Sequence, residues 1–296
     1  MRTNYFSQLH PGVCCCFFLY AVTFSILFNH PIMMATSCLA ALFCAGSMSG
    51  WKTLGISVLF TIPTIVIFAV VNPFFNHQGT TPLFYWNDQP ITLESTLYGL
   101  CSGVTIISMI MWFICFQKTV ENHKLLYLFG KVIPTIALMV TMILRFIPYF
   151  KRKLNQIAAT QRMFGVSTSS GSIKNRLRAG GSILSVLFSI SMEGTVGTSD
   201  SMRARGYGLK GKTHYKSFCM KPRDWFFLGV LCGASALLIW AFYAKQFQFY
   251  FFPAMTDWRL NPIQLGICIF HCIILCSPLL YNGWEGLRWH RIQVTA

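Results

Sequence analysis

One stretch of the chain carries a pattern that binds phosphate in many proteins. Residues 206–213 read GYGLKGKT and match G-x-x-x-x-G-K-[ST], in which backbone N–H groups cradle phosphate oxygens. That chemistry requires a buried strand before the loop and a helix after it. Here a helical pattern precedes the loop and an apolar segment follows it, so we interpret these residues as a flexible basic loop. A membrane nucleotide hydrolase that uses residues 206–213 is the alternative hypothesis.

A second group of residues with ligand-binding side chains lies near the C-terminus. Cys268, Cys272 and Cys276 follow one another at helical spacing, and His271 lies among them. A structural metal site needs thiolates at close, matched spacing, and no C-x-x-C pair occurs in the chain. Cysteine in an apolar run is a small packing residue. We therefore predict neither a metal site nor a cofactor. Because no nucleophile–base or carboxylate pair can be assembled, we also predict no catalytic residues.

Two segments that contain arginine each end at a glycine and could bind a partner. They comprise Arg162, Met163, Phe164 and Gly165 in the first, and Arg203, Ala204, Arg205 and Gly206 in the second. Either segment alone is compatible with ordinary capping, because a basic last turn and a following glycine stabilise a helix C-terminus. Two such ends favour docking instead, since arginine in an acidic groove makes several charge-assisted hydrogen bonds. The groove must belong to another protein, because this chain has only 8 Asp and Glu.

The composition indicates which class of protein must position these segments. The chain has 296 residues, of which 54% are hydrophobic and 11% are charged, and its mean hydropathy is +0.53. Soluble domains carry about 25% charged residues and disordered chains are poor in apolar ones, so both classes are excluded. Of the 24 Lys and Arg, fifteen lie between Arg145 and Arg223, together with only two acids. That concentration favours a basic cytoplasmic segment of a membrane protein over a nucleic-acid-binding protein.

The apolar runs predict six membrane-spanning helices, since about 20 apolar residues span the hydrocarbon core. They are residues 13–28, 32–50, 54–71, 97–116, 225–244 and 263–281. The loop at 72–95 contains no Lys or Arg and is expected outside, which places both termini in the cytoplasm. We predict a multi-pass protein of the cell membrane, surrounded by the lipid bilayer. Its parts are a four-span bundle at 1–124, a cytoplasmic module at 125–221, and a C-terminal hairpin and tail at 222–296.

The cytoplasmic module has the pattern of two long helices. Phe146, Phe150, Leu154 and Ile157 recur at helical spacing within a first helix at 133–162, interrupted or kinked at its prolines. A second helix at about 174–205 carries a row of small residues that lets another helix approach closely: Gly181, Ser185, Ser189, Gly194 and Gly197. We expect an all-α fold in which these two helices cross at this row of small residues. The alternative is a pair of surface helices that holds the membrane bundle together.

These segments together resemble the transmembrane T component of energy-coupling factor transporters, the EcfT or CbiQ-like family. The resemblance runs from about residue 6 to residue 225 and rests on His10-Pro11, Asn29-His30-Pro31, Leu144-Arg145-Phe146-Ile147-Pro148, Gln161-Arg162 and Met202-Arg203-Ala204-Arg205-Gly206-Tyr207-Gly208. The last of these motifs is the most specific. The resemblance implies a helical membrane scaffold whose coupling helices join two ABC-type ATPase subunits to a substrate-binding membrane S component. Such a complex imports vitamins or transition-metal ions such as cobalt or nickel.

The resemblance also implies which residues dock. In that family each coupling helix ends in an Ala-Arg-Xaa motif whose arginine enters a groove of an ATPase subunit. Ala204-Arg205-Gly206 matches one motif in full. The other motif falls on Met163-Phe164-Gly165, so Phe164 stands where the family has the docking arginine. Either Arg162 serves from two positions earlier or Phe164 packs in an apolar groove.

We therefore predict a non-catalytic coupling subunit of an ATP-driven importer, with ATP hydrolysis in the partner subunits. A stand-alone permease is a further alternative. It is less favoured because the predicted spans contain almost no ionisable residues, and carriers of polar solutes place functional groups there. The sequence does not indicate the cargo, because the substrate pocket would lie in another polypeptide.

Overall fold

The protein divides into two compact units. The computed structural model describes residues 5–86, 89–165, 172–207, 209, 218–253, 255–256 and 258–295. The first unit, here called the membrane bundle, combines Met1–Leu125 with Phe218–Ala296. The second, here called the two-helix unit, comprises Leu126–Ser217.

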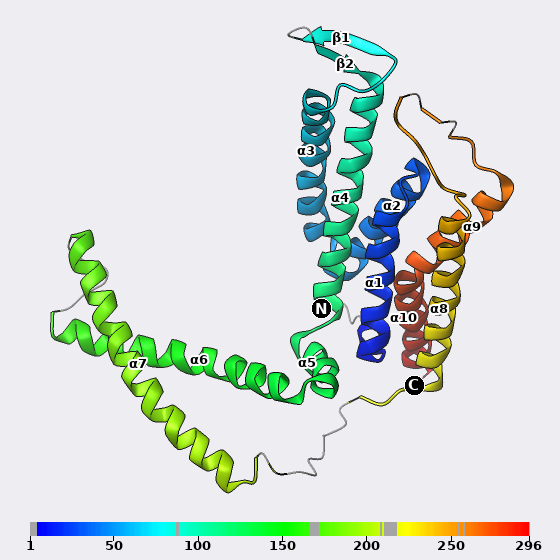
Figure 1. Cartoon of the computed structure of the whole chain (residues 1–296). Helices are drawn as coiled ribbons and strands as arrows, with labels where there is room; N and C mark the ends of the chain where they lie inside the picture. The colour runs from blue at the N-terminus through cyan, green and yellow to red at the C-terminus, as the bar shows by residue number, and fades with distance from the viewer. Residues whose placement is uncertain are drawn as a thin grey trace. The chain divides into compact units, whose positions relative to one another are not determined.

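Nearly all elements are helices, as the sequence predicts. A short 3-10 helix, η1 (Tyr5–Gln8), precedes α1 (Pro11–Leu27), α2 (Pro31–Ser49), α3 (Trp51–Phe75) and α4 (Leu93–Thr119) (Figure 1). The middle of the chain forms α5 (Asn122–Val132), α6 (Pro134–Met163) and α7 (Ile173–Ala204). The last helices are α8 (Pro222–Tyr243), α9 (Pro262–Leu275) and α10 (Ser277–Thr295). The prediction of an all-α membrane protein with two long helices in its middle is confirmed.

Six described helices are long and apolar enough to cross a membrane, namely α2, α3, α4, α6, α7 and α8. The pair α9 and α10, bent by 50° at its break, makes a seventh if it counts as one span. With 17 residues, α1 is shorter than these, although it is apolar throughout. Five of the six predicted spans therefore lie in one helix of the membrane bundle, apart from at most one residue at the end, whereas the sixth, 263–281, runs across the break between α9 and α10. The helices α6 and α7 also qualify, but they are the least apolar of the six.

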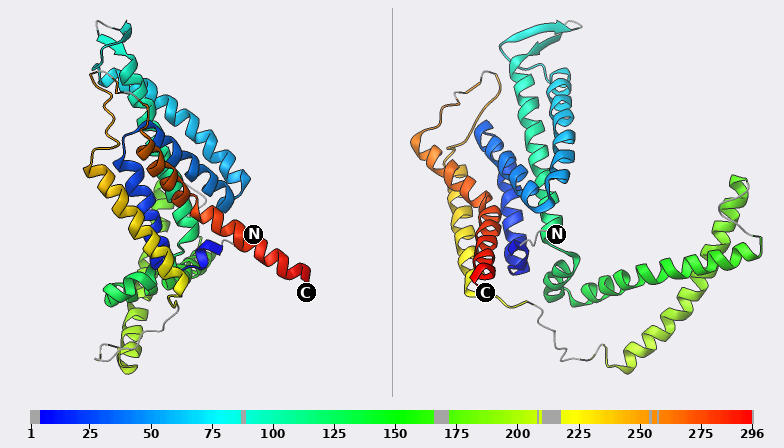
Figure 2. Two further views of the ribbon diagram at one scale, coloured as in Figure 1. Left: turned by 90° about the vertical axis from the view of Figure 1, so that its right-hand side faces the viewer. Right: turned by 180° about the vertical axis from the view of Figure 1, so that it is seen from behind.

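The segment between α3 and α4 is more ordered than the plain loop predicted at 72–95. It contains an antiparallel pair of strands, β1 (Pro82–Trp86) and β2 (Gln89–Thr92), which lies at the ends of α3 and α4 (Figure 2). Aromatic residues in β1 favour a strand. The carboxylate of Glu94 fixes the segment to α4, because it accepts hydrogen bonds from the Thr80 hydroxyl (3.1 Å) and the Thr81 hydroxyl (2.9 Å).

The centre of the membrane bundle is held by an aromatic core and a small polar network. Trp112 is fully buried on α4, and its ring lies edge-on to Phe17 and Phe18 of α1. Its indole N–H donates to the Ser37 hydroxyl (3.3 Å), which is in turn 2.9 Å from the Ser108 hydroxyl. Hydrogen bonds of this kind join helices where packing against lipid gives no hydrophobic driving force.

The helices α3 and α4 approach each other closely at two glycines of α4. A Cβ atom at Gly99 would lie 2.5 Å from the Phe68 carbonyl oxygen, and one at Gly103 would lie 3.2 Å from Ile65 Cα. Gly99 and Gly103 form a G-x-x-x-G pair, which allows backbones to approach closely in membranes. The small residues needed for tight helix packing are therefore on α4.

Gly99→Ala should destabilise the bundle by about 1–3 kcal/mol, because α3 must move away from the added methyl group. Gly229→Ala on α8 is the matched control, since a Cβ atom there would meet nothing within 4 Å. Thermal unfolding of the two variants in detergent measures the difference. A Gly99→Ala variant as stable as the control would contradict the close contact.

Two histidines begin the first two helices in the same way. His10 and His30 are the N-caps of α1 and α2, and each is followed by proline at the first helical position. Their Nδ1 atoms accept hydrogen bonds from the backbone N–H groups of Gly12 (3.2 Å) and Ile32 (3.4 Å). Proline suits that position because its missing N–H is not needed there. The two His-Pro pairs are thus helix starts.

His30 should make bundle stability depend on pH. Burial lowers the pKa of His30 below its ordinary value of 6.5, so the folded state binds fewer protons than the unfolded state. Its contribution is therefore present above about pH 6.5 and is lost as the pH falls below that value. His30→Ala should cost about 1 kcal/mol at neutral pH, whereas His30→Asn keeps a capping acceptor that does not titrate. Thermal unfolding between about pH 7.5 and 5.5 should be less pH-dependent in His30→Asn than in wild type; equal slopes would refute this assignment.

Candidate functional site

The two-helix unit is built by the contact of α6 with α7, which cross each other (Figures 1 and 2). On α6, Phe146, Phe150 and Ile157 of the predicted apolar stripe are half-buried, while Leu154 is exposed. On α7, the buried residues are Ala179 and Ile183. The helix bounds agree with the predicted segments 133–162 and 174–205 to within a residue at each end. Periodicity therefore predicted both helices well.

The C-terminus of α6 presents apolar side chains. The backbone N–H of Phe164 donates to the Gln161 carbonyl and that of Gly165 donates to the Arg162 carbonyl, both at 3.1 Å. Gly165 has a φ of +78°, which glycine adopts without strain. Beside it, Met163 and Phe164 are 87% and 78% exposed. The end of α6 therefore presents an exposed apolar surface.

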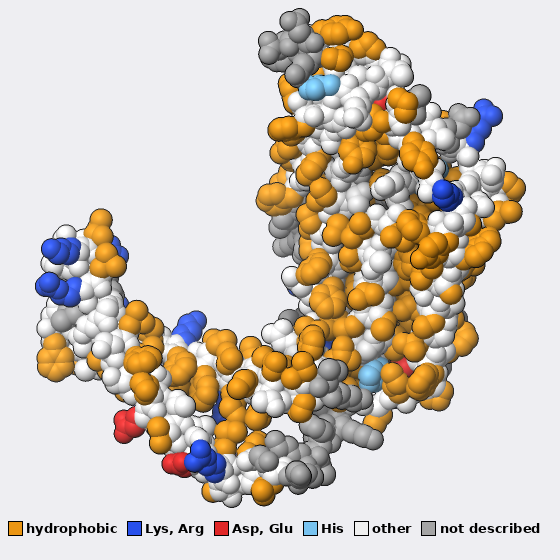
Figure 3. Space-filling view, in the orientation of Figure 1, with side chains coloured by type: hydrophobic (Ala, Val, Ile, Leu, Met, Phe, Trp, Pro, Cys, Tyr) orange, Lys and Arg blue, Asp and Glu red, His pale blue; other side chains and the backbone are white. Residues whose placement is uncertain are grey.

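The C-terminus of α7 also stops at a left-handed glycine but has a basic surface. The N–H of Gly206 donates to the Arg203 carbonyl (2.9 Å) and that of Tyr207 donates to the Met202 carbonyl (3.1 Å), with φ of +77° at Gly206. Arg203, Ala204 and Arg205 are all exposed. Figure 3 shows Lys and Arg side chains beside hydrophobic ones on this unit. Each helix therefore ends at a left-handed glycine and projects its preceding side chains into the open.

A hollow of about 510 Å³ lies between the first half of α6 and the last turns of α7. Its lining includes two arginines, Arg145 and Arg205, and two of the five predicted small residues, Gly194 and Gly197. The sequence pattern did not single out Arg145 as a partner of Arg205, because the two are distant in the chain. The hollow combines positive charge with an apolar wall.

The remaining small residues of α7 do not face this hollow. Gly181, Ser185 and Ser189 are exposed, and a Cβ atom at Gly181, Gly194 or Gly197 would meet nothing within 4 Å. The three glycines of this row therefore make no close contact with α6, and a crossing of the two helices at the row stays a prediction.

The two ligand-binding patterns noted in the sequence have different surroundings. Of residues 206–213, only Gly206, Tyr207 and Leu209 fall within the described part of the chain, and the element before them is the helix α7. His271 is buried in the bundle, where its Nδ1 is 2.9 Å from the Tyr20 hydroxyl. Among the residues that the structure describes, no three His, Cys, Asp or Glu are grouped to hold a metal ion.

Comparisons with known proteins agree on one family. A family model described as "cobalt transport protein" matches residues 3–215. The chain is 24% identical over 250 residues to the energy-coupling factor transporter transmembrane protein EcfT 1 of Listeria monocytogenes, an alignment that covers 72% of this chain and 91% of the relative. It is 25% identical over 223 residues to EcfT of Lacticaseibacillus paracasei, covering 70% and 82% of the two chains. To EcfT of Bacillus subtilis it is 33% identical over 104 residues, covering 35% and 39%.

The family match covers η1 and the helices α1 to α7, including the two exposed helix ends of the two-helix unit, and it stops before α8. The chain therefore belongs to the EcfT/CbiQ-like family of transmembrane components of energy-coupling factor transporters.

Proposed function

We propose that this chain is the non-catalytic coupling subunit of an ATP-driven importer. In this proposal the two-helix unit binds two ABC-type ATPase subunits, and the chain also binds a membrane S component that holds the cargo. The single observation that carries it is the pair of exposed helix ends, Met163-Phe164-Gly165 and Ala204-Arg205-Gly206. Each ends at a left-handed glycine whose N–H donates to the carbonyl three residues before it. Two like ends suit two like partners.

The two helix ends would bind their ATPase subunits through different kinds of contact. At the end of α7, Arg205 is exposed and would form charge-assisted hydrogen bonds with an acidic groove. At the end of α6, Phe164 occupies the equivalent position and is 78% exposed, so we propose an apolar contact there. Arg162, also exposed, would contribute at the edge of that contact. This difference would let each end select its own ATPase subunit.

The two-helix unit is proposed to lie on the cytoplasmic side, with both chain termini. The support is the concentration of Lys and Arg between Arg145 and Arg223 and the absence of these residues from 72–95. The lower apolarity of α6 and α7, and their amphipathic pattern, support a position along the membrane surface rather than across it.

The exposed small residues of α7 offer a place for the S component. Gly181, Ser185 and Ser189 lie on the exposed surface of α7, and Gly194 and Gly197 line the hollow beside α6. Small side chains at these positions allow the backbone of a further helix to approach. We propose that the cargo, a vitamin or a transition-metal ion, is bound by that component and not by this chain.

Arg205→Glu should abolish stable binding of the ATPase that docks at the end of α7. Truncating one partner of a buried, hydrogen-bonded charge pair costs about 2–5 kcal/mol, so reversal of its sign should weaken binding at least thirtyfold. Phe164→Asp should weaken binding at the end of α6. Arg178→Glu makes the same charge change at an exposed position in the first half of α7 and is the control.

Co-purification of the chain with candidate ATPase subunits, quantified by the amount of ATPase retained, checks both variants. Wild-type behaviour of Arg205→Glu would overturn the docking assignment, and equal loss in Arg178→Glu would reduce it to a non-specific charge effect.

The nucleotide hydrolase makes a different prediction. If residues 206–213 bound ATP, the isolated chain would hydrolyse it and Lys212→Ala would remove that activity. We expect no hydrolysis above background in either protein, because a helix precedes the segment where a P-loop needs a strand. Hydrolysis that disappears in Lys212→Ala would replace our proposal.

A further inference from the structure

We propose that Lys124 is a positioning residue that, together with η1, fixes both chain connections between the membrane bundle and the two-helix unit. The clasp, as we call it, consists of Phe6, Ser7, Lys124, Arg223, Tyr281 and Glu285, all of which belong to the membrane bundle. The inference rests on the proposed function, because a coupling subunit must transmit movement through these two connections.

The first connection leaves the bundle immediately after Lys124, since the two-helix unit begins at Leu126. The Lys124 ammonium donates to the carbonyl oxygen of Ser7 (2.6 Å) and to that of Thr119 (2.8 Å). Thr119 is the last residue of α4, where the helix dipole favours a positive charge. One side chain therefore ties together the N-terminal segment, the end of α4 and the start of α5.

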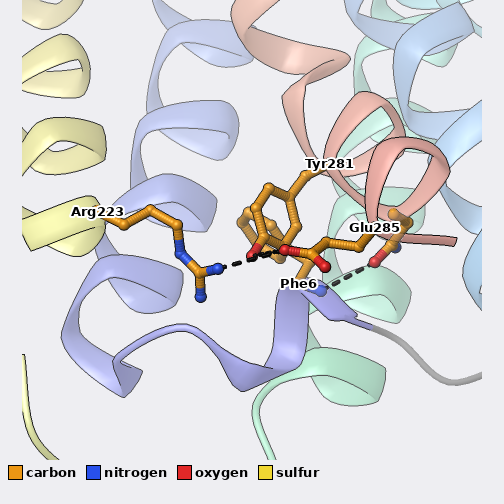
Figure 4. Close-up of polar contacts among 5 residues, drawn as sticks. Phe6, Arg223, Tyr281 and Glu285 are labelled. Atoms are coloured by element: carbon orange, nitrogen blue, oxygen red, sulfur yellow. Dashed lines mark hydrogen bonds and ion pairs between the residues drawn. The ribbon is translucent and has the colours of Figure 1, made fainter. Parts of the chain in front are cut away.

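The N-terminal segment in turn is locked into the bundle by Phe6. Its ring is fully buried and lies edge-on to Phe17 of α1 (centroids 5.5 Å apart), Phe227 of α8 (5.9 Å) and Tyr281 of α10 (6.4 Å). Its backbone N–H donates to the Asn282 side-chain oxygen (2.9 Å) (Figure 4). The segment that receives Lys124 thus contacts the helix that begins after the second connection.

The second connection returns to the bundle at the start of α8, which is held by a polar cluster next to Phe6 (Figure 4). The Arg223 guanidinium is 3.5 Å from the Glu285 carboxylate and lies 5.2 Å from the centre of the Tyr281 ring. The Tyr281 hydroxyl donates to the same carboxylate (3.4 Å). Tyr281 therefore contacts both Phe6 and Arg223, which completes the link from Lys124 to α8.

Burial of the Lys124 ammonium is the feature that needs a reason. The residue is 5% exposed, so its charge has lost most of its hydration, which is unfavourable unless strong hydrogen bonds replace it. An apolar side chain could fill the same space without that cost. Two charge-assisted hydrogen bonds to backbone carbonyls resist sliding of one segment past another, which apolar contacts alone do not. If the two-helix unit moves, segments that cannot slide past one another at Lys124 would pass that movement on to the membrane bundle.

Hydrogen–deuterium exchange of the full chain in lipid nanodiscs tests the clasp without any partner. Lys124→Met should accelerate exchange at the start of α8, at Asp224 and Trp225, by about tenfold or more, although Lys124 donates no hydrogen bond to α8. Lys118→Met, which removes an exposed lysine from the last turn of α4, should leave these amides unchanged. Phe6→Leu keeps an apolar side chain but removes the aromatic contacts of η1 with α8 and α10. This variant should accelerate exchange both near Lys124 and at the start of α8. Acceleration confined to residues 119–126 would overturn the proposal.

A second measurement separates positioning from plain stabilisation. In a complex with the ATPase subunits, binding of a non-hydrolysable ATP analogue should change exchange in α6 and α7 and also at Asp224 and Trp225. In Lys124→Met the response to the analogue should remain in α6 and α7 and be at least fivefold smaller in the bundle. A lysine that only stabilised the fold would leave the size of the bundle response unaltered, which would overturn the clasp alone. Failure of the wild-type chain to bind ATPases would instead count against the proposed function.

Discussion

The packing of the Phe6 ring is the interaction on which the organisation of the membrane bundle depends. Its ring meets side chains of α1, α8 and α10, and its N–H is bound by a residue 276 positions away in the chain. Edge-on aromatic contacts add to the area that such a ring buries. Because the neighbouring Ser7 carbonyl accepts from Lys124, the same short segment bears on the point where the chain leaves the bundle. Lys124 and Arg223, which flank the two connections to the two-helix unit, are therefore both linked to this segment, the first directly and the second through Tyr281.

The membrane bundle and the two-helix unit use small residues for different purposes. In the bundle, Gly99 and Gly103 let α3 and α4 approach until a methyl group would no longer fit. On α7, the small residues Gly181, Gly194 and Gly197 leave open space around them. Each of these glycines weakens an isolated helix. Tight packing compensates for this in α4, whereas in α7 the compensation would have to come from a partner that lies on the open surface.

The ends of α6 and α7 show that the same kind of glycine stop can expose two different surfaces, one apolar and one basic. A left-handed glycine stops each helix at a defined residue, so the preceding side chains project from the helix end. The identity of those side chains then decides what is presented, which is an apolar surface at Met163 and Phe164 and a basic one at Arg203 and Arg205. Neither end has its side chains buried within the unit. Under the proposed function, two ATPase subunits would each bind one of these ends, which differ in surface chemistry.

The sequence by itself determined the class of protein, the apolar helices and the bounds of α6 and α7. These features follow from local rules, because helical periodicity and glycine stops act over a few residues. The His-Pro pairs at the starts of α1 and α2 also follow a local rule, because a cap satisfies backbone groups within one turn. Only the tertiary structure decided which aromatic side chains pack against Phe6 and which carbonyl groups bind the Lys124 ammonium. It also decided that the closest glycine contact lies on α4 and not on α7. The β1–β2 pair was likewise not predicted. Contacts between segments far apart in the chain depend on which helix faces meet, and a single sequence contains no local signal for that choice.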